Sequence, residues 1–310
     1  MSLHAMNRRT FLEGATAVTA ATLFANRLGW AAEGHKIDKD HIGIQLYTVR
    51  FAIEKDFDGS LAKVAQAGYK KVELAGFSFD DGQVHYFKKT PQELHSALDH
   101  HGLDPVSTHL NYKFLSPEVL PKVLDASKLL GHKYIVCPWV EEEVRKTPDS
   151  WKGVCETFNR VGEATKKAGF QFAYHNHWFE FLPVNGKLPY DILLEGCDPN
   201  LVKMEMDLCW ITAAGSDPLK YFERYPGRFP LVHVKDLKTL PHITSGGPQN
   251  FGDTTDLTEV GSGIIDWKKI FAHSEQAGID YYIVEHDHPK QPFESIKTSY
   301  EYLSKLQWQA

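Results

Sequence analysis

The chain has 310 residues, of which 42% are hydrophobic, and its formal net charge at pH 7 is −6. This length suits one large barrel or two ordinary domains, and the composition allows a sizeable core. The negative charge and the absence of a lysine/arginine run argue against a protein that binds nucleic-acid backbones. The four cysteines form no CxxC pair, so neither a zinc ribbon nor a disulfide framework is expected.

The first 33 residues have the pattern of a twin-arginine export signal. Arg8-Arg9 precede a mildly apolar stretch, Gly14–Leu28, and a small-residue exit at Ala31-Ala32. An ordinary amphipathic first helix is the alternative. The apolar stretch is too short for a stable membrane span. We therefore assign residues 1–33 to an export signal with a few added leader residues, and expect a periplasmic mature protein.

Beyond the signal, short apolar strands alternate with amphipathic helices, a pattern typical of parallel α/β folds. Strands are expected at Ile42–Leu46, Lys71–Leu74, Pro105–His109, Tyr134–Pro138, Phe170–His175, Val202–Asp207, Leu231–Lys235 and Tyr281–Glu285. Helices are expected at Phe57–Ala67, Pro91–His101, Pro117–Leu130, Ser150–Ala168, Trp267–Ala277 and Phe293–Leu306. Four of these helices end at a glycine just before the next strand, as a left-handed helix stop requires.

Eight such units over residues 38–310 predict a (β/α)8 TIM barrel in a single domain. The alternative, an open doubly wound sheet, would need a glycine-rich phosphate loop after the first strand. The segment Ile42–Arg50 contains no such loop. One connection, Lys238–Gly263, is too long and too rich in glycine, threonine and proline for a plain turn, which predicts a lid or a binding loop.

Polar side chains gather at the ends of four of the expected strands. His175 and His177 follow the fifth strand, and Asp207, His233 and Glu285 follow the next three. Because the carboxyl ends of barrel strands meet at one face, these side chains should converge. Two carboxylates and two imidazoles from different strands suit a divalent metal. We expect His175, Asp207, His233 and Glu285 to be the ligands, with His177 as the main alternative to His175.

Further candidates lie at other strand ends. Glu73 and His109 are interpreted as acid/base or substrate-hydroxyl residues, with packing or helix capping as the alternative. His177 and Lys235 are further catalytic candidates, and Gln45 is a candidate for substrate binding. For Gln45 and Lys235 the alternative is ordinary solvation. Three tryptophans just past strand ends should form an apolar wall for a sugar ring, or else pack at the barrel rim: Trp139, Trp178 and Trp210.

Several segments resemble the xylose-isomerase-like superfamily of TIM barrels, which includes the sugar phosphate isomerases/epimerases. They are GIQLYTVR, KKVELAGF, AYHNHWFEF, MEMDLCW, LVHVKD, EVGSGIIDW and IVEHD, and the resemblance covers the chain after residue 40. It implies a divalent metal held by a glutamate, an aspartate, a histidine and a glutamate on strands five to eight. The last three fall on Asp207, His233 and Glu285, whereas His175 stands where the first glutamate is usual.

This departure affects the expected chemistry. Ketose epimerases of the superfamily use two glutamates as bases on opposite faces of the substrate, and His175 replaces one of them. The resemblance implies a divalent-metal-dependent sugar isomerase or epimerase that abstracts a proton next to a carbonyl. A lyase or dehydratase of the same barrel family, acting on a 3-keto-glycoside or an inosose, is the alternative. A non-catalytic carbohydrate-binding barrel is the alternative from another class.

The expected ligands and partners follow from the same residues. Mn²⁺ is the expected metal because carboxylates and imidazoles are mixed, although Zn²⁺ or Co²⁺ would bind the same set. The expected partner is a small-molecule sugar or keto-sugar. Nucleic acid is not expected, because the endonuclease branch of the superfamily needs additional histidines for a trinuclear zinc site. The oligomeric state stays open, with a homo-oligomer among the alternatives.

Overall fold

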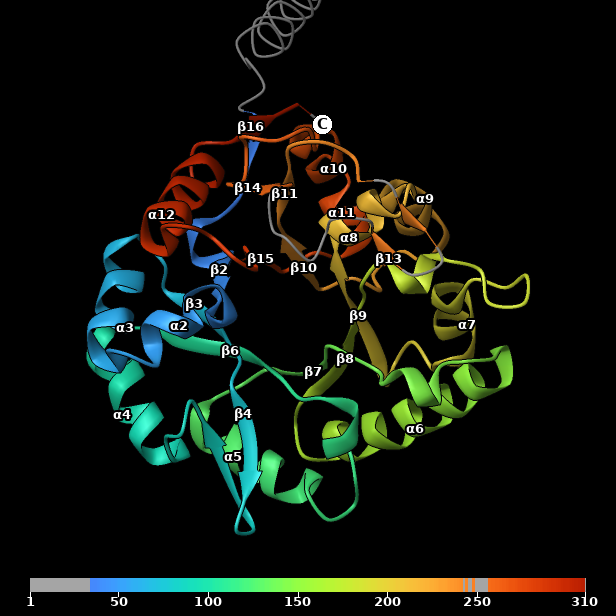
Figure 1. Ribbon diagram of the computed structural model, residues 1–310, viewed down its shortest axis with the longest axis horizontal. Coiled ribbons are helices and arrows are strands. Elements are labelled where there is room, and N and C mark those ends of the chain that lie inside the picture. The colour runs from blue at the N-terminus through green and yellow to red at the C-terminus, as the bar shows by residue number, and fades with distance from the viewer. Residues whose placement is uncertain (1–33, 242, 245–246, 249–255, 310) are drawn as a thin grey trace, which may run out of the picture.

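The computed structural model of the chain describes residues 34–241, 243–244, 247–248 and 256–309. Parallel strands form a closed barrel in the order β10-β15-β2-β3-β6-β7-β8-β9 (Figure 1). Their bounds are β2 (Ile42–Gln45), β3 (Lys71–Leu74), β6 (Asp104–His109), β7 (Tyr134–Cys137), β8 (Gln171–His175), β9 (Val202–Asp207), β10 (Leu231–Val234) and β15 (Tyr281–Val284). The predicted single-domain TIM barrel is confirmed. The expected export signal, residues 1–33, lies outside the described residues.

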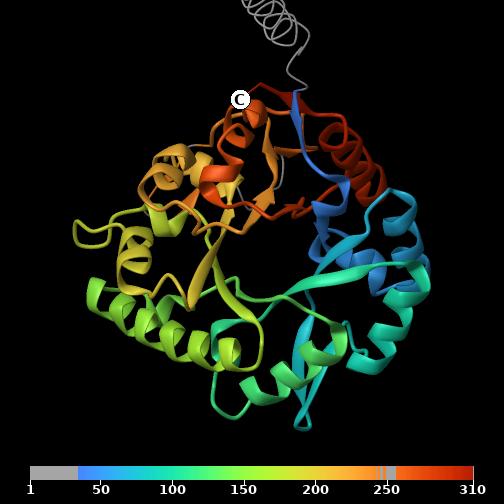
Figure 2. The same ribbon diagram turned by 180° about the vertical axis from the view of Figure 1, so that it is seen from behind.

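Helices surround the barrel, as the two opposite views show (Figures 1 and 2). The main ones are α3 (Phe57–Gln66), α4 (Pro91–His101), α5 (Leu120–Leu130), α6 (Pro148–Lys167), α7 (Pro189–Gly196), α8 (Leu208–Ala213), α9 (Pro218–Arg224), α10 (Trp267–Phe271), α11 (Ser274–Ala277) and α12 (Pro292–Leu303). Local sequence sets their ends. Thr90 and Glu93 form a capping box at the start of α4, and Gly102 ends this helix with a left-handed φ of 65°. No described helix has both the length and the apolar character needed to cross a membrane.

The structure differs from the sequence-based expectations in several elements. The expected helix Trp267–Ala277 is divided into α10 and α11, and α5 begins at Leu120 rather than at Pro117. A hairpin of β4 (Phe77–Asp80) and β5 (Gln83–Tyr86) follows β3 and was not expected. Its turn, Asp81-Gly82, has positive φ angles of 51° and 74°, which an Asp-Gly pair adopts readily in tight hairpins. The expected connection Lys238–Gly263 is described only in part.

The interior of the barrel is apolar at one level and charged at another. Alternate residues of a strand share a face, so Leu231 and His233 of β10 both point inward, as do Ile283 and Glu285 around β15. The apolar level contains Val106, Val136, Ala173, Leu231, Tyr281 and Ile283. Gly43 makes room for this level, because a Cβ atom there would lie 2.6 Å from Ile283 Cδ1. The charged side chains therefore rest on a packed apolar base at the carboxyl ends of the strands.

Candidate active site

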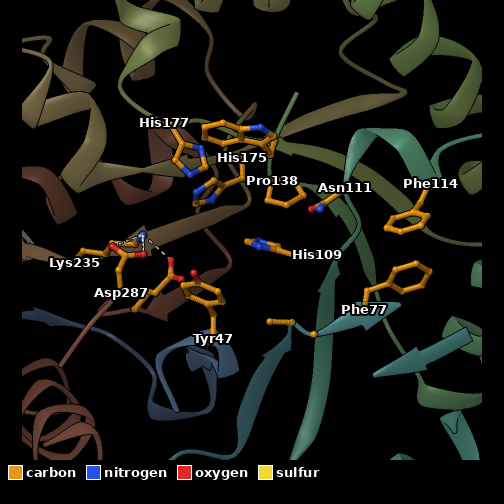
Figure 3. Close-up of a pocket in the computed structure, with 14 residues that line it drawn as sticks. Tyr47, Phe77, His109, Asn111, Phe114, Pro138, His175, His177, Lys235 and Asp287 are labelled. Atoms are coloured by element: carbon orange, nitrogen blue, oxygen red, sulfur yellow. Dashed lines mark hydrogen bonds and ion pairs between the residues drawn. The ribbon is translucent and has the colours of Figure 1, made fainter. Parts of the chain in front are cut away.

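A cavity of about 320 Å³ opens at the carboxyl ends of the barrel strands (Figure 3). Figure 3 shows Phe77 and Phe114 together on the side of the cavity away from Lys235 and Asp287. The polar side chains that line the cavity are His109, Asn111, His175, His177, Lys235, Glu285 and Asp287, and Tyr47, Pro138 and Trp139 complete much of the wall. The cavity thus has a charged end and an aromatic end.

Strand pairing places the functional side chains next to one another. His175 on β8 pairs with Glu205 on β9, and Asp207 on β9 pairs with His233 on β10. Glu205 and Asp207 are two residues apart on one strand, so both face the interior of the barrel. Glu205 lies further from the strand end and is fully buried.

Glu205 lies at the centre of three imidazoles. Its Oε2 atom is 2.9 Å from His109 Nε2, 3.0 Å from His175 Nδ1 and 3.2 Å from His233 Nε2. Its other oxygen, Oε1, is buried and has no hydrogen-bond partner in the described part of the chain. A buried carboxylate needs such partners or a cation, because its transfer from water is otherwise very costly.

A second buried carboxylate, Glu73, adjoins this group. Gln45 Nε2 donates to its Oε1 at 2.8 Å, and Ser107 Oγ donates to its Oε2 at 2.6 Å. Its Oε1 is also 2.9 Å from His109 Nε2 and 2.7 Å from His233 Nε2. Burial would raise the pKa of Glu73, but the two imidazoles outweigh it and hold this pKa well below its usual range.

The pKa values of the neighbouring imidazoles shift in the opposite direction, upward. Burial opposes a positive charge on His109, but Glu73 and Glu205 overcome it and raise the pKa of His109 to about 9. The same balance of burial against carboxylates raises the pKa of His233. When no other cation is bound, the positive charges of protonated His109 and His233 therefore balance the negative charges of Glu73 and Glu205.

Lys235 brings an ammonium to the charged end of the cavity. It is 2% exposed, and its Nζ lies 3.2 Å from Asp207 Oδ2, 2.7 Å from Glu285 Oε2 and 3.2 Å from Asp287 Oδ1. Burial would lower the pKa of Lys235, but these three carboxylates raise it above its usual value. Burial raises the pKa of Asp207 to about 6 despite the neighbouring ammonium. Lys235 is therefore protonated in this site, and its ammonium is held in position by the three carboxylates.

The turn after β8 fixes His177. The buried carboxylate of Glu180 accepts a hydrogen bond from the backbone N–H of His177 at 2.8 Å and another from the Tyr174 hydroxyl. Asn176 exchanges hydrogen bonds with the backbone of Asp207, donating at 3.3 Å and accepting at 3.1 Å. The turn is thus attached to the neighbouring strand β9, and His177 is held over the cavity.

Aromatic rings enclose the imidazole of His177. Its ring centroid lies 5.0 Å from that of Trp139, 5.7 Å from that of Phe179 and 5.8 Å from that of Trp210. Its Nδ1 atom is buried without a hydrogen-bond partner in the part of the chain that the structure describes. Burial, followed by repulsion from Lys235, lowers the pKa of His177 well below its usual value. His177 is therefore a neutral imidazole that lines the cavity, and its Nδ1 atom is buried.

The structure brings half of the twelve predicted residues to the lining of this cavity. The predicted residues that line it are His109, Trp139, His175, His177, Lys235 and Glu285. The fully buried ones that stand behind its wall are Gln45, Glu73, Asp207 and His233. Trp178 and Trp210 pack against each other, with ring centroids 4.9 Å apart, beside His177.

Two charged residues of the site were missed by the sequence analysis. Asp287, which was not among the predicted site residues, lines the cavity and pairs with Lys235. Glu205 was not considered, although a signal was present. A carboxylate two residues before Asp207, inside an otherwise apolar strand, must face the same side as Asp207 and hence the barrel interior.

The donor set fits a divalent metal. Ligand atoms lie within 4.8 Å of one another in two groups that share His233: His109, His175, Glu205 and His233, and Asp207, His233 and Glu285. Imidazole and carboxylate donors in a buried site suit Zn²⁺, Mn²⁺ and related ions. The coarse expectation of a metal-binding site at the strand ends is thus supported by the geometry.

Comparison with known proteins identifies the family to which this barrel belongs. Over 282 residues the chain is 28% identical to inosose dehydratase of Lacticaseibacillus casei, covering 81% of this chain and 89% of that protein. A sugar phosphate isomerase/epimerase from Parabacteroides distasonis superposes with a TM-score of 0.71 at 27% identity, covering 89% of this chain and 96% of that one. The IOLI protein, whose structure contains a zinc atom, has the same fold, with a TM-score of 0.62 at 18% identity and coverage of 85% and 98%. Residues 61–306 match the family described as xylose isomerase-like TIM barrel, and the chain therefore belongs to that family.

Proposed function

We propose that this protein is a divalent-metal-dependent dehydratase that removes water from a cyclic keto-sugar or keto-polyol. The observation that carries the proposal is the contrast between His177 and Lys235, which line the same cavity. One is a neutral imidazole among aromatic rings, and the other is a buried ammonium among carboxylates. Elimination next to a carbonyl needs one base and one proton donor, and this pair supplies both.

His177 is the base in this proposal. It takes the hydrogen from the carbon next to the substrate carbonyl, and the electrons of that C–H bond form the new double bond. The aromatic rings around it disfavour a protonated imidazole before substrate binds. The backbone hydrogen bond from His177 to Glu180 keeps its position constant.

Lys235 is the proton donor. The hydroxyl on the neighbouring carbon leaves with the electron pair of its C–O bond, takes a proton from the ammonium and becomes water. Glu285 and Asp287 hold this ammonium at 2.7 and 3.2 Å, so its direction is fixed before the reaction. The positive charge also favours the negative charge that develops on the substrate.

A metal bound at this site would polarise the carbonyl and so acidify the neighbouring C–H bond. Its ligands would come from the six converging side chains, namely His109, His175, Glu205, Asp207, His233 and Glu285. Mn²⁺ was expected from the sequence, and the three imidazoles suit Zn²⁺ equally well. The sequence-based ligand set of His175, Asp207, His233 and Glu285 remains a prediction.

Isomerisation or epimerisation is the second candidate, and the similarity to the Parabacteroides distasonis protein favours it. The position of His175 argues against a symmetric two-base epimerase. Its Nδ1 lies 3.0 Å from Glu205 Oε2, and its Nε2 lies 3.8 Å from Asp207 Oδ2, so both nitrogens face carboxylates. The inosose dehydratase relatives support the elimination reaction for this chain.

A purely sugar-binding barrel is the candidate from another class. The buried charges of Glu73, Glu205 and Lys235 argue against it, because charges at full burial oppose stability unless a function retains them. The cavity volume of about 320 Å³ accommodates a single small ligand in either case.

The reaction class is tested by incubating the metal-loaded protein with inososes, ketohexoses and 3-keto-glycosides in D₂O and following them by NMR. A dehydratase yields an unsaturated product or its keto tautomer with one water less than the substrate. An epimerase yields an isomer of unchanged composition with deuterium at the inverted carbon. The second pattern, or no turnover of any of these compounds, would contradict the proposal.

A further inference from the structure

One end of the active-site cavity is aromatic, and the proposed reaction does not use it. Phe77 and Phe114 line this end, with their ring centroids 4.9 Å apart in an edge-to-face arrangement (Figure 3). Both rings are only partly buried, although they pack against the apolar core. Aromatic rings that contact the core on one side and a cavity on the other are suited to bind a ligand.

The two ends of the cavity are built from opposite sides of the barrel. Phe77 begins β4, which follows β3, and Phe114 ends the short 3₁₀ helix η3 (Tyr112–Phe114), which follows β6. Lys235 and Glu285 directly follow β10 and β15. In the closed order of strands, β6 lies four strands from β10 in either direction. A group that contacts Phe114 is therefore separated from the Lys235 ammonium by the width of the cavity.

Local structure holds the two aromatic residues in place. Phe77 pairs with Tyr86 across the β4–β5 hairpin, and their ring centroids lie 5.6 Å apart. Tyr86 is fully buried, so it anchors the hairpin to the core. The backbone N–H of Phe114 donates a hydrogen bond to the backbone oxygen of Asn111 at 2.9 Å, which closes the turn of η3. Both rings are thus positioned before a ligand binds, which lowers the entropic cost of binding.

The lining of this end suits an apolar face rather than a set of hydroxyls. The described residues that line the cavity after β3 and after β6 are Ala75, Gly76, Phe77, Asn111 and Phe114, and of these Asn111 is polar. A hydroxyl buried there without a partner would oppose binding. The C–H face of a sugar ring, or the face of an aryl ring, would instead contact the two phenylalanine rings favourably.

The cavity is also larger than one keto-sugar ring needs. Its volume of about 320 Å³ lies within the range of ~300–1,000 Å³ for pockets that bury drug-sized ligands, which are larger than a single six-carbon ring. When a keto-sugar ring contacts His177 and Lys235, the space beside Phe77 and Phe114 remains for a further part of the substrate.

We propose that the substrate carries a second ring with an apolar face beside its keto-sugar ring, and that Phe77 and Phe114 bind this second ring. The assignment deepens the proposed function and rests on it for the place of the keto-sugar ring at the charged end. A pyranose joined through a glycosidic oxygen and an aryl group share the required chemistry. The substrate class is therefore a ring-substituted keto-sugar rather than a free monosaccharide.

Binding of glucosides that lack the carbonyl needed for the proposed reaction tests this assignment without turnover. The dissociation constants of methyl β-D-glucoside, phenyl β-D-glucoside and cellobiose are measured by NMR titration of the protein in the presence of Zn²⁺. The phenyl glucoside, cellobiose or both should bind about fivefold more tightly than the methyl glucoside, because only a second ring reaches Phe77 and Phe114. The tighter of the two ligands identifies whether an aryl group or a second sugar is preferred.

A pair of phenylalanine variants locates the preference. Phe114→Ala should reduce it to less than about twofold and leave binding of the methyl glucoside unchanged, because it removes one of the two rings. Phe51→Ala is the control and should keep the wild-type preference, since Phe51 on α2 (Arg50–Ile53) is 59% exposed and is not among the described residues that line the cavity. Circular dichroism checks that both variants fold, and the wild-type preference remains a test if the Phe114 variant does not.

Equal dissociation constants for the three glucosides in the wild-type protein, or no binding of any of them, would overturn the assignment. An unchanged preference in the Phe114 variant would also overturn it. Since no turnover is followed, a failed dehydratase assay would leave a measured ring preference intact. Conversely, a missing ring preference would leave the outcome of the dehydratase assay unaffected.

Discussion

His175 changes the charge of the site less than the sequence suggests. It stands where the family pattern has a glutamate, which would leave the ligand set with one carboxylate fewer. The structure shows that Glu205 lies directly beside it on the next strand, in register and 3.0 Å away. A carboxylate of β9 therefore lies beside the position where β8 carries an imidazole, and the surroundings of His175 remain acidic.

His177 provides the most direct test of the catalytic proposal at the residue scale. We predict that His177→Gln lowers kcat by about 10²–10⁴, the usual contribution of a general base, and leaves metal content unchanged. The measurement is the turnover rate together with metal analysis of the purified variant. His95→Gln serves as the control, because His95 is a partly exposed histidine of α4, away from the cavity. Wild-type turnover by the His177 variant would show that another group is the base.

Glu180 makes stability depend on pH. Burial raises the pKa of Glu180 from 4.5 to about 7, so the folded protein retains a proton that the unfolded chain releases. This contribution to stability is complete below about pH 4.5 and is lost as the pH rises to about 7. We predict a loss of about 3 kcal/mol in the free energy of unfolding from this group between pH 4.5 and pH 8.

The Glu180→Gln variant isolates this contribution. Its side chain stays neutral, so its unfolding free energy should fall less than that of the wild type over the same pH range. Urea unfolding at pH 5 and at pH 8 measures both losses. Glu163→Gln, at an exposed position of α6, should follow the wild type. Equal pH dependence in the Glu180 variant and the wild type would contradict the assigned pKa.

At the scale of elements, Asp236 organises the chain between β10 and β15. Its buried carboxylate accepts hydrogen bonds from Gly261 N at 2.9 Å, Gly263 N at 3.2 Å and Trp267 Nε1 at 2.9 Å. It lies directly after the candidate site residues His233 and Lys235 in the sequence. The end of the long connection is therefore attached to the barrel next to the site.

We predict that Asp236→Ala lowers the free energy of unfolding by about 3–5 kcal/mol, because several buried donors lose their charged acceptor at once. Asp266→Ala is the control on the same segment. Asp266 is exposed and only caps α10 through Lys269 N at 3.1 Å, so its loss should cost about 1 kcal/mol. Urea unfolding monitored by tryptophan fluorescence compares the two. Similar losses in both variants would show that Asp236 does not organise the segment.

At the scale of the whole molecule, the two ends of the described chain meet. The short strand β1 (His35–Lys36) pairs antiparallel with β16 (Gln307–Trp308), on the outer side of the ring of helices (Figure 1). The residues that precede β1 in the sequence include the expected export signal. Export in the folded state would allow a metal site in the barrel to be loaded beforehand, which suits a metalloenzyme.

We propose that the protein is exported to the periplasm by the twin-arginine route. Replacing Arg8 and Arg9 together by lysine should leave the precursor in the cytoplasm, because this route recognises the arginine pair rather than positive charge alone. Fractionation of cells followed by immunoblotting measures the distribution. Replacement of Lys36 and Lys39 by arginine, beyond the signal, is the control and should not change it. Normal periplasmic accumulation of the double-lysine variant would exclude this route.

The sequence by itself determined that the fold is a barrel and that the candidate site residues lie at the carboxyl ends of its strands. All eight barrel strands lie within one residue of their expected bounds, because alternation of apolar strands with glycine-ended helices is a local signal. His175, Asp207 and His233 were identified for the same reason, since each lies at or near the end of an apolar run, whereas Glu205 inside β9 was not. The β4–β5 hairpin was missed although its Asp-Gly turn is also local.

Only the tertiary structure decided which of these side chains contact one another. His109 and Glu205 are 96 residues apart, and Glu73 and His233 are 160 apart, yet each pair is in hydrogen-bond contact. These contacts depend on barrel closure and on strand register, which no single segment encodes. The position of the Lys235 ammonium among three carboxylates has the same origin. Which polar residues end the strands thus follows from the sequence, whereas closure of the barrel determines which of their charged side chains lie around the Lys235 ammonium.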